Sequence, residues 1–232
     1  MKTYVQSNSN GSTGTATTVT VTLNGNITVG NTLLVFLYGQ TATVTSVTDN
    51  LSNTYTQDFS HTSSNGKKYA YSAPVTTGGS CTITWTFPSN TLPREIIVVE
   101  HRYLNATPFD QSVTVTGITA AGGATSGATA SLTQNFELVV GLSALFNSSD
   151  ATGTWTIDME NVIQEATGGT SYRFSYASRL NNSTNGQAVT VQSWSPTGSN
   201  YTLICLTYKY TPNDPFRRNN LRPAIFKPGL AR

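Results

Sequence analysis

Residues able to perform acid–base or nucleophilic chemistry are few in this chain of 232 residues. The only histidines are His61, in a polar stretch, and His101, which follows Glu100 at the end of an apolar run. A hydrolytic centre needs a nucleophile, a base and an orienting acid that converge, and no G-x-S-x-G turn presents a serine. The sequence therefore predicts a protein that is not an enzyme. We interpret the segment around His101 as a strand end that emerges into solvent or into an interface.

The carboxylates predict neither a glycosidase nor a metal centre. Glycoside cleavage needs two acids several ångströms apart in a cleft, and no pair in the first half is flanked in a way that indicates one. Loop acids such as Asp49 and Asp58 offer oxygen ligands for Ca²⁺, but no D-x-D-x-D-G loop is present. Cysteine and histidine are too few for a zinc site. We expect no metal and no cofactor.

Two cysteines and several aromatic residues lie in strand-like segments. Cys81 and Cys205 each lie inside an apolar run, so we expect buried free thiols. A disulfide between them is the alternative if their strands are neighbours. Five rings admit two interpretations, a sugar-stacking platform or core packing, and core packing is the commoner fate of rings on alternating strands. These rings are Trp85, Trp155, Trp194, Tyr172 and Tyr176.

Strands must position all of these residues. Only 10% of the residues are charged, against about 25% in an average protein, and the abundant Thr, Val and Tyr favour strands. Residues 17–23 alternate valine or leucine with threonine, as a half-buried strand does. The continuous apolar run at 31–37 predicts a central strand buried on both faces.

Further strands are expected wherever apolar alternation or apolar runs recur, and no amphipathic helix is apparent. Residues 60–66 are polar and are predicted to be a loop, and residues 120–130 are small and Gly-rich and are predicted to be a loop or a weak edge strand. The expected fold is an all-β, antiparallel β-sandwich of jelly-roll type, one domain over residues 1–210 without a repeat of fixed period. The remaining expected strands are 44–49, 54–56, 67–73, 81–87, 94–103, 111–115, 136–145, 155–157, 161–165, 171–178, 188–194 and 201–210.

The last segment, 211–232, differs from the rest of the chain in charge and in proline content. It holds four prolines and five basic residues against one acid, Asp214, so its net charge is +4 and that of the remaining residues is −2. A near-neutral body with a basic tail lacks the basic face with interleaved aromatics of a nucleic-acid-binding domain. We therefore expect no nucleic-acid partner.

We predict that this tail is an extended strap that binds another protein. Prolines favour extended geometry, and at about 3.3 Å per residue the tail reaches on the order of 70 Å. Its arginines suit carboxylates on a neighbour, although a solvated end or a clasp onto its own body are alternatives. The expected contact residues are Phe216, Arg217, Arg218, Arg222, Phe226, Lys227 and Arg232.

The chain carries no sign of export or of membrane insertion. The N-terminal sequence MKTYVQSNSNGSTG lacks the apolar core of a secretory signal peptide. No run approaches the ~20 apolar residues of a membrane span. We expect synthesis in a cytoplasm and no membrane partner.

Several segments carry a resemblance to a protein family. They are GNTLLVFLYG, SVTDNLSNTYT, KKYAYSAPVTTGGSCTITWTF, IIVVEHRYLNATPFDQS and ATSGATASLTQNFELVVGL, followed by the ending RPAIFKPGLAR. Their strand order and turn residues resemble β-sandwich structural proteins of tailed bacteriophages, which have relatives inside secreted bacterial surface proteins. The resemblance implies a virion component, such as a capsid decoration or cement protein or a head- or tail-associated part.

That resemblance also implies the partners. They would be the major capsid protein or neighbouring structural subunits, and the chain itself would form a symmetric oligomer such as a trimer. The alternative is a glycan-binding adhesion module of a phage fibre or of a bacterial surface protein.

Overall fold

Antiparallel β-strands make up the fold. The computed structural model describes residues 2–40, 43–64, 66–88, 93–119, 122–146, 152–156, 158–165, 172–195 and 198–211. These residues form sixteen strands, and no helix among them is long and apolar enough to cross a membrane. The all-β sandwich of jelly-roll type is thus confirmed, whereas the predicted tail beyond Thr211 lies outside the described residues.

The first eight strands build one jelly roll. A five-stranded sheet has the order β1-β8-β3-β6-β5, and a three-stranded sheet has the order β2-β7-β4. This interleaving of early and late strands is that of a jelly roll. The strands are β1 (Tyr4–Ser12), β2 (Thr18–Thr22), β3 (Thr32–Gly39), β4 (Ser46–Asp49), β5 (Thr56–Ser63), β6 (Gly66–Pro74), β7 (Thr82–Thr86) and β8 (Arg94–His101).

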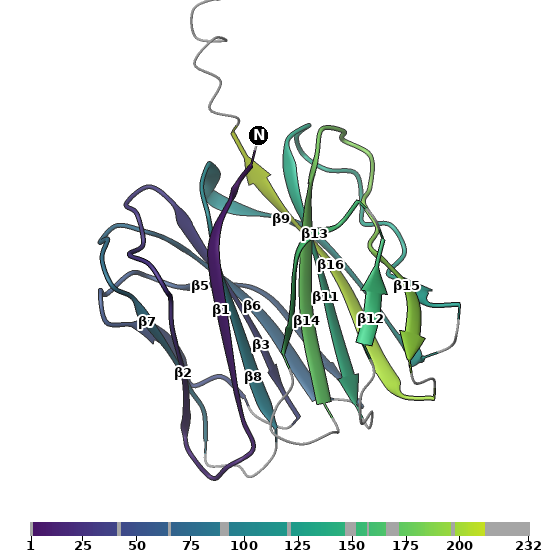
Figure 1. Ribbon diagram of the computed structural model, residues 1–232. Coiled ribbons are helices and arrows are strands. Elements are labelled where there is room, and N and C mark those ends of the chain that lie inside the picture. Colours follow the sequence, from purple (N-terminus) through teal and green to yellow (C-terminus); the bar gives the residue numbers. More distant parts are fainter. Residues whose placement is uncertain are drawn as a thin grey trace, which may run out of the picture.

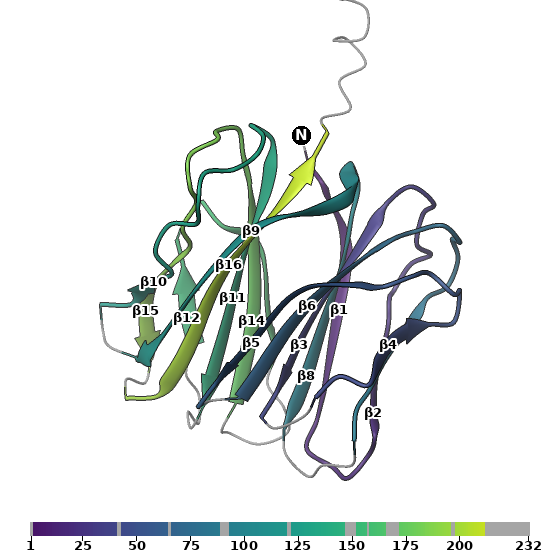
Figure 2. The ribbon, with the colours of Figure 1, turned by 180° about the vertical axis from the view of Figure 1, so that it is seen from behind.

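The second eight strands repeat the same topology. Their sheets have the orders β9-β16-β11-β14-β13 and β10-β15-β12, so each strand takes the place of the strand eight numbers before it (Figures 1 and 2). The chain is therefore a structural duplication. The strands are β9 (Leu104–Ile118), β10 (Ala124–Thr125), β11 (Glu137–Phe146), β12 (Thr152–Trp155), β13 (Glu160–Glu165), β14 (Tyr172–Asn181), β15 (Thr190–Ser195) and β16 (Asn200–Tyr210).

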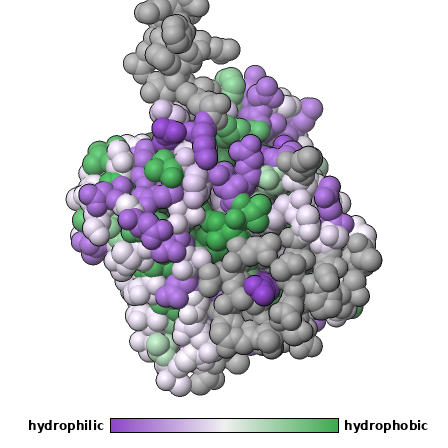
Figure 3. Space-filling view, viewed as in Figure 1, coloured by the Kyte–Doolittle hydropathy of each residue, from purple (hydrophilic) through white to green (hydrophobic). Residues whose placement is uncertain are grey.

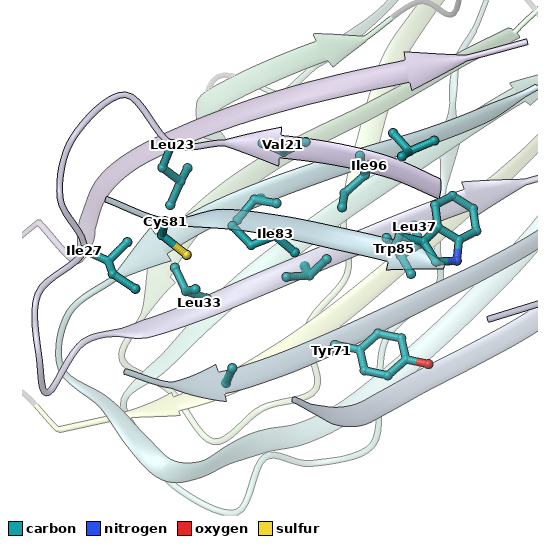
Figure 4. Close-up of a cluster of buried hydrophobic side chains, with 14 of the residues drawn as sticks. Val21, Leu23, Ile27, Leu33, Leu37, Tyr71, Cys81, Ile83, Trp85 and Ile96 are labelled. Carbon is teal, nitrogen blue, oxygen red and sulfur yellow. The ribbon is translucent and has the colours of Figure 1, made fainter. Parts of the chain in front are cut away.

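The four sheets stack as layers with three apolar cores between them. The first core lies inside the first jelly roll, around Trp85 and Ile83 (Figure 4). The third lies inside the second jelly roll, around Trp155 and Val191. The middle core lies between the two five-stranded sheets, which pack face to face. There Phe36 stacks on Tyr176 with ring centroids 5.4 Å apart. The two jelly rolls therefore form one continuous stack.

Strand β3 explains why its sequence is apolar throughout. It lies between β8 and β6 in the sheet, and all eight of its residues are buried. Alternate side chains enter the first core and the middle core, as Val35 and Phe36 do. The prediction of a central strand buried on both faces is confirmed.

The two halves meet with an approximate two-fold relation. At one end of the middle core β1 contacts β13, and at the other end β5 contacts β9. Since β9 takes the place of β1 and β13 that of β5, exchanging the halves turns one contact into the other. This arrangement makes the two ends of the middle core equivalent positions.

Two polar edge strands escaped the sequence in whole or in part: β1 was not predicted, and β5 was predicted only at its first residue, Thr56. The sequence of β1 has no apolar alternation, yet it pairs along β8, and its Asn8 and Asn10 side chains donate to the Thr22 and Thr20 carbonyls of β2, each at 2.8 Å. Strand β5 includes residues 60–63, which were expected to be a loop, and it pairs with β6 only. These two strands are held by side-chain hydrogen bonds or by pairing with one neighbouring strand, and therefore show no apolar pattern in the sequence. The structure also contains four sheets, where a single two-sheet sandwich was expected.

Candidate functional site

The middle core contains a buried histidine. The ring of His101 is fully buried, with Nε2 2.9 Å from the Tyr176 hydroxyl and Nδ1 3.2 Å from Thr3 Oγ1. Burial lowers its pKa to about 3, because a charged imidazolium would lose its hydration there. His101 is thus a neutral link between the two jelly rolls, so of the two expectations for this strand end the solvent-exposed one is wrong and the interface is the one found.

Glu100 is also buried, and it ties three segments together. Its Oε1 accepts hydrogen bonds from the Thr28 amide at 3.0 Å and from Asn31 Nδ2 at 2.6 Å. Its Oε2 accepts one from Gln6 Nε2 at 2.7 Å. A buried carboxylate that accepts hydrogen bonds from three donors is a structural cross-link.

Two buried cations have similar roles. Lys68 donates to Ser63 Oγ at 2.8 Å and to the Gly66 carbonyl at 3.0 Å, and burial lowers its pKa to about 7. Arg94 donates to the carbonyls of residues 14 and 16 and lies 4.2 Å above the Phe87 ring. Both side chains therefore hold hairpins and loops in place.

Asp49, considered as a calcium ligand, organises its own loop. Its carboxylate accepts from the Leu51 and Asn53 amides at 2.8 and 3.1 Å, and from the Asn53 side chain and the Tyr55 hydroxyl at 2.9 Å each. These bonds outweigh burial and lower the pKa of Asp49. Among the described residues no group of three or more His, Cys, Asp or Glu side chains is placed to hold a metal ion.

The rings that can be placed follow the favoured interpretation, core packing, and not the alternative of a sugar-stacking platform. Trp85, Trp155 and Tyr176 have exposed fractions of 0%, 6% and 0%, so core packing is their role and a sugar-stacking role for them is wrong. The side chains of Trp194 and Tyr172 lie outside the described residues. Cys81 and Cys205 are buried and free, as predicted.

A pocket opens at the end of the middle core where β5 and β6 meet β9. Its volume is about 270 Å³. The first jelly roll contributes residues of β5 and β6, and the second contributes the start of β9. The lining residues are Thr56, Gln57, Asp58, Ser72, Pro74, Ala106, Thr107, Pro108 and Phe109.

Asp58 is the titratable group of this pocket. Ser72 Oγ donates to its Oδ1 at 3.0 Å, and the buried Tyr208 hydroxyl lies beside the same carboxyl. Burial raises the pKa of Asp58 to about 7, although the hydrogen bond from Ser72 and the nearby Tyr208 hydroxyl act in the opposite direction. The carboxyl is therefore able to donate or accept a hydrogen bond near neutral pH.

The equivalent end of the middle core holds a second pocket of about 270 Å³. It is formed by β13, β14 and the start of β1, which take the places of β5, β6 and β9. Ser178 lines it in the position of Ser72, but Lys2, Glu160 and Arg179 make it a charged pocket. The duplication thus presents two pockets of equal size and different chemistry.

Comparisons with protein-family models, with curated proteins and with solved structures found no match. The chain is therefore described by its own geometry. The pocket was not predicted from the sequence, because Asp58 and Phe109 meet only when the two jelly rolls pack. No local motif marks either residue. The seven residues assigned to the strap, from Phe216 to Arg232, lie outside the described residues, and their role stays a prediction.

Proposed function

We propose that this protein is a non-enzymatic structural component of a tailed-bacteriophage virion. It would act as a capsid decoration or cement protein or as a head- or tail-associated part, and bind neighbouring virion proteins through its body and its C-terminal strap. The observation that carries the proposal is that buried groups with catalytic potential act as cross-links. His101 and Glu100 connect separate segments of the stack, and Lys68 closes the hairpin between β5 and β6.

The layered body suits a part that holds other proteins at fixed positions. Three apolar cores run through it, and Ser63 Oγ lies 3.2 Å from Thr202 Oγ1 across the junction of the halves. The surface drawn in Figure 3 mixes hydrophilic and hydrophobic residues, with a hydrophobic cluster near its centre. Close packing gives such an interior low compressibility, so the body would present its surface as a rigid unit.

The strap is proposed from its sequence. It begins after Thr211, whose amide donates to the Tyr103 carbonyl at 2.9 Å, so the tail departs beside the connection between the two jelly rolls. Its net charge of +4 contrasts with −2 for the other residues. Arginine forks pair well with carboxylates, and Phe216 and Phe226 supply apolar anchors, so an acidic surface on a neighbouring virion subunit is the partner we infer.

Deletion of residues 215–232 tests the strap. The truncated protein should fold, because all sixteen described strands end by Tyr210, but should no longer be incorporated into particles in a complementation assay. A variant with Arg217, Arg218 and Arg222 changed to glutamine separates charge from length and should reduce incorporation. Normal incorporation of the truncated protein would refute the strap. Light scattering of the purified protein tests the proposed symmetric oligomer, such as a trimer, against a monomer.

A glycan-binding adhesion module is the second candidate. The observation that favours it is the pocket between β5, β6 and β9, which combines apolar rings with hydrogen-bonding groups. A glycan array tests this candidate separately, because it needs neither particles nor the strap.

A further inference from the structure

The exposed charged side chains gather at the seam between β1 and β13, the end of the middle core that holds the charged pocket. Among the described lysines and arginines only Lys2 and Arg102 are exposed, and among the described acids only Asp158 and Glu160 are. Lys2 and Glu160 line the pocket itself, and Arg102 Nε donates to the Lys2 carbonyl at 3.0 Å. This seam therefore differs in charge from the rest of the described surface.

The two signs lie on opposite sides of the seam. Lys2 precedes β1 and Arg102 follows β8, so both cations belong to the first jelly roll, whereas Asp158 and Glu160 lie at the start of β13 in the second. Asp158 is paired with Arg179 at 3.2 Å. The Lys2 ammonium and the Glu160 carboxylate form no ion pair with any described residue. A surface with an unpaired cation on one side and an unpaired carboxylate on the other is complementary to a copy of itself.

Two exposed valines accompany these charges. Val5 of β1 is 39% exposed and Val162 of β13 is 46% exposed, and the two strands contact each other. Each valine stands at an irregularity of strand pairing, between residues 4 and 6 of β1 and between residues 160 and 163 of β13, where a bulge redirects side chains. Figure 1 looks onto this seam, and Figure 3 shows that the same face mixes hydrophobic with hydrophilic residues. Apolar residues bordered by charges are typical of a protein contact surface.

The equivalent seam between β5 and β9 lacks both features. Its acids, Asp58 and Asp110, are half-buried, and its exposed rim residues Ala106 and Thr107 are small or uncharged. No residue that lines its pocket is both exposed and charged, and none is an exposed large apolar residue. Packing of one jelly roll on the other therefore does not itself require exposed charges and valines at such a seam.

We propose that the seam between β1 and β13 binds the same seam of a second copy of this chain about a two-fold axis. In such a contact each pair of facing residues occurs twice, so Lys2 of each copy faces Glu160 of the other, and Val5 faces Val162. A partner with a surface of one sign would repel one side of the seam, whereas a second copy matches both sides. The inference gives a geometry to the proposed symmetric oligomer and needs neither the virion role nor the strap.

Sedimentation velocity of the full-length protein tests the contact. The monomer has a mass of 24.8 kDa, and a species of twice that mass should appear as the concentration rises from about 10 to 500 µM, a range suited to a contact below the standard size of about 800 Å² per partner. Val162→Asp should abolish this species. Ile118→Asp is the matched control, because Ile118 is 66% exposed and lies at the end of β9, and it should leave association unchanged.

A charge exchange tests the pairing of the two sides. Lys2→Glu and Glu160→Lys each place like charges at both contacts of the dimer, so each variant alone should associate at least about tenfold more weakly. An equimolar mixture of the two variants restores opposite charges at both contacts of the mixed dimer and should associate as the parent chain does.

Four results would overturn the proposal. They are a parent chain that stays monomeric over the whole range, a trimer in place of the dimer, a dimer that survives Val162→Asp, and a mixture of the charge variants that associates no better than either variant alone. None of these measurements involves particles, so a failed contact between copies remains distinguishable from a failure of the virion role, which incorporation assays test.

Discussion

The free energy of unfolding of the Asp58→Asn variant, minus that of the parent chain, should be larger at alkaline pH than at acidic pH. Asp58 lies at the junction of the two jelly rolls and accepts a hydrogen bond from Ser72. Burial raises its pKa from 3.8 to about 7, so the folded state favours the protonated carboxyl. Asparagine has the shape of that neutral form and does not titrate.

The size of the effect follows from linkage. Between the unfolded pKa of 3.8 and the folded pKa of about 7, the folded state binds more protons than the unfolded state, so the parent chain loses stability as the pH rises. Each pKa unit corresponds to about 1.4 kcal/mol. The shift therefore amounts to about 4 kcal/mol, which access of water through the pocket reduces to about 2–4 kcal/mol.

The assay is urea unfolding of both proteins at pH 4, 6 and 8. The free energy of unfolding of Asp58→Asn minus that of the parent should rise by about 2–4 kcal/mol from pH 4 to pH 8. Taking the difference cancels the other titrating groups. Glu160→Gln, which replaces an exposed carboxylate outside this pocket, is measured alongside as the matched substitution control. A constant difference for Asp58→Asn across this range would refute the assignment of a buried, protonated carboxyl.

Three further predictions concern buried contacts. Tyr176→Phe removes the hydroxyl 2.9 Å from His101 Nε2 and should lower the free energy of unfolding at pH 7 by about 1–3 kcal/mol, because a buried ring nitrogen loses its partner; chemical denaturation measures this, and an unchanged value would contradict the link between the jelly rolls. The pKa of His101 is about 3 in the folded protein and 6.5 in the unfolded chain. The free energy of unfolding of the parent chain should therefore fall as the pH drops from 6.5 to 3, and that of His101→Gln should fall less. Gly141→Ala places a methyl group 2.6 Å from the Trp155 ring and should cost about 1–3 kcal/mol through overpacking; a melting temperature equal to that of the parent would show that β12 yields easily.

Local patterns in the sequence predict the strands that bury an apolar face. Alternation in β2 and the apolar run of β3 need no knowledge of the partner strands, because the period and the number of covered faces are visible in the chain. Strands β1 and β5 lack such a signal. They form because β8 and β6 offer open edges, and because Asn8 and Asn10 reach the neighbouring sheet.

The duplication and the site escape sequence reasoning for a different reason. The two halves share strand order but not a visible residue pattern, so no repeat of fixed period appears. The burial of His101 and the pocket around Asp58 both arise where one jelly roll covers the other. Such features depend on contacts between residues far apart in the sequence, 75 positions for His101 and Tyr176, and carry no local mark.

The short connection between β8 and β9 has a physical consequence. Only Arg102 and Tyr103 separate the two strands. Because the halves also share one topology and meet with an approximate two-fold relation, they resemble the subunits of a symmetric dimer whose association has become intramolecular. Tethering replaces dependence on protein concentration by a fixed effective concentration. The apolar layer between the jelly rolls should therefore persist at any dilution. Each equivalent surface can also accept a substitution alone, which a true homodimer, carrying every change twice, does not permit.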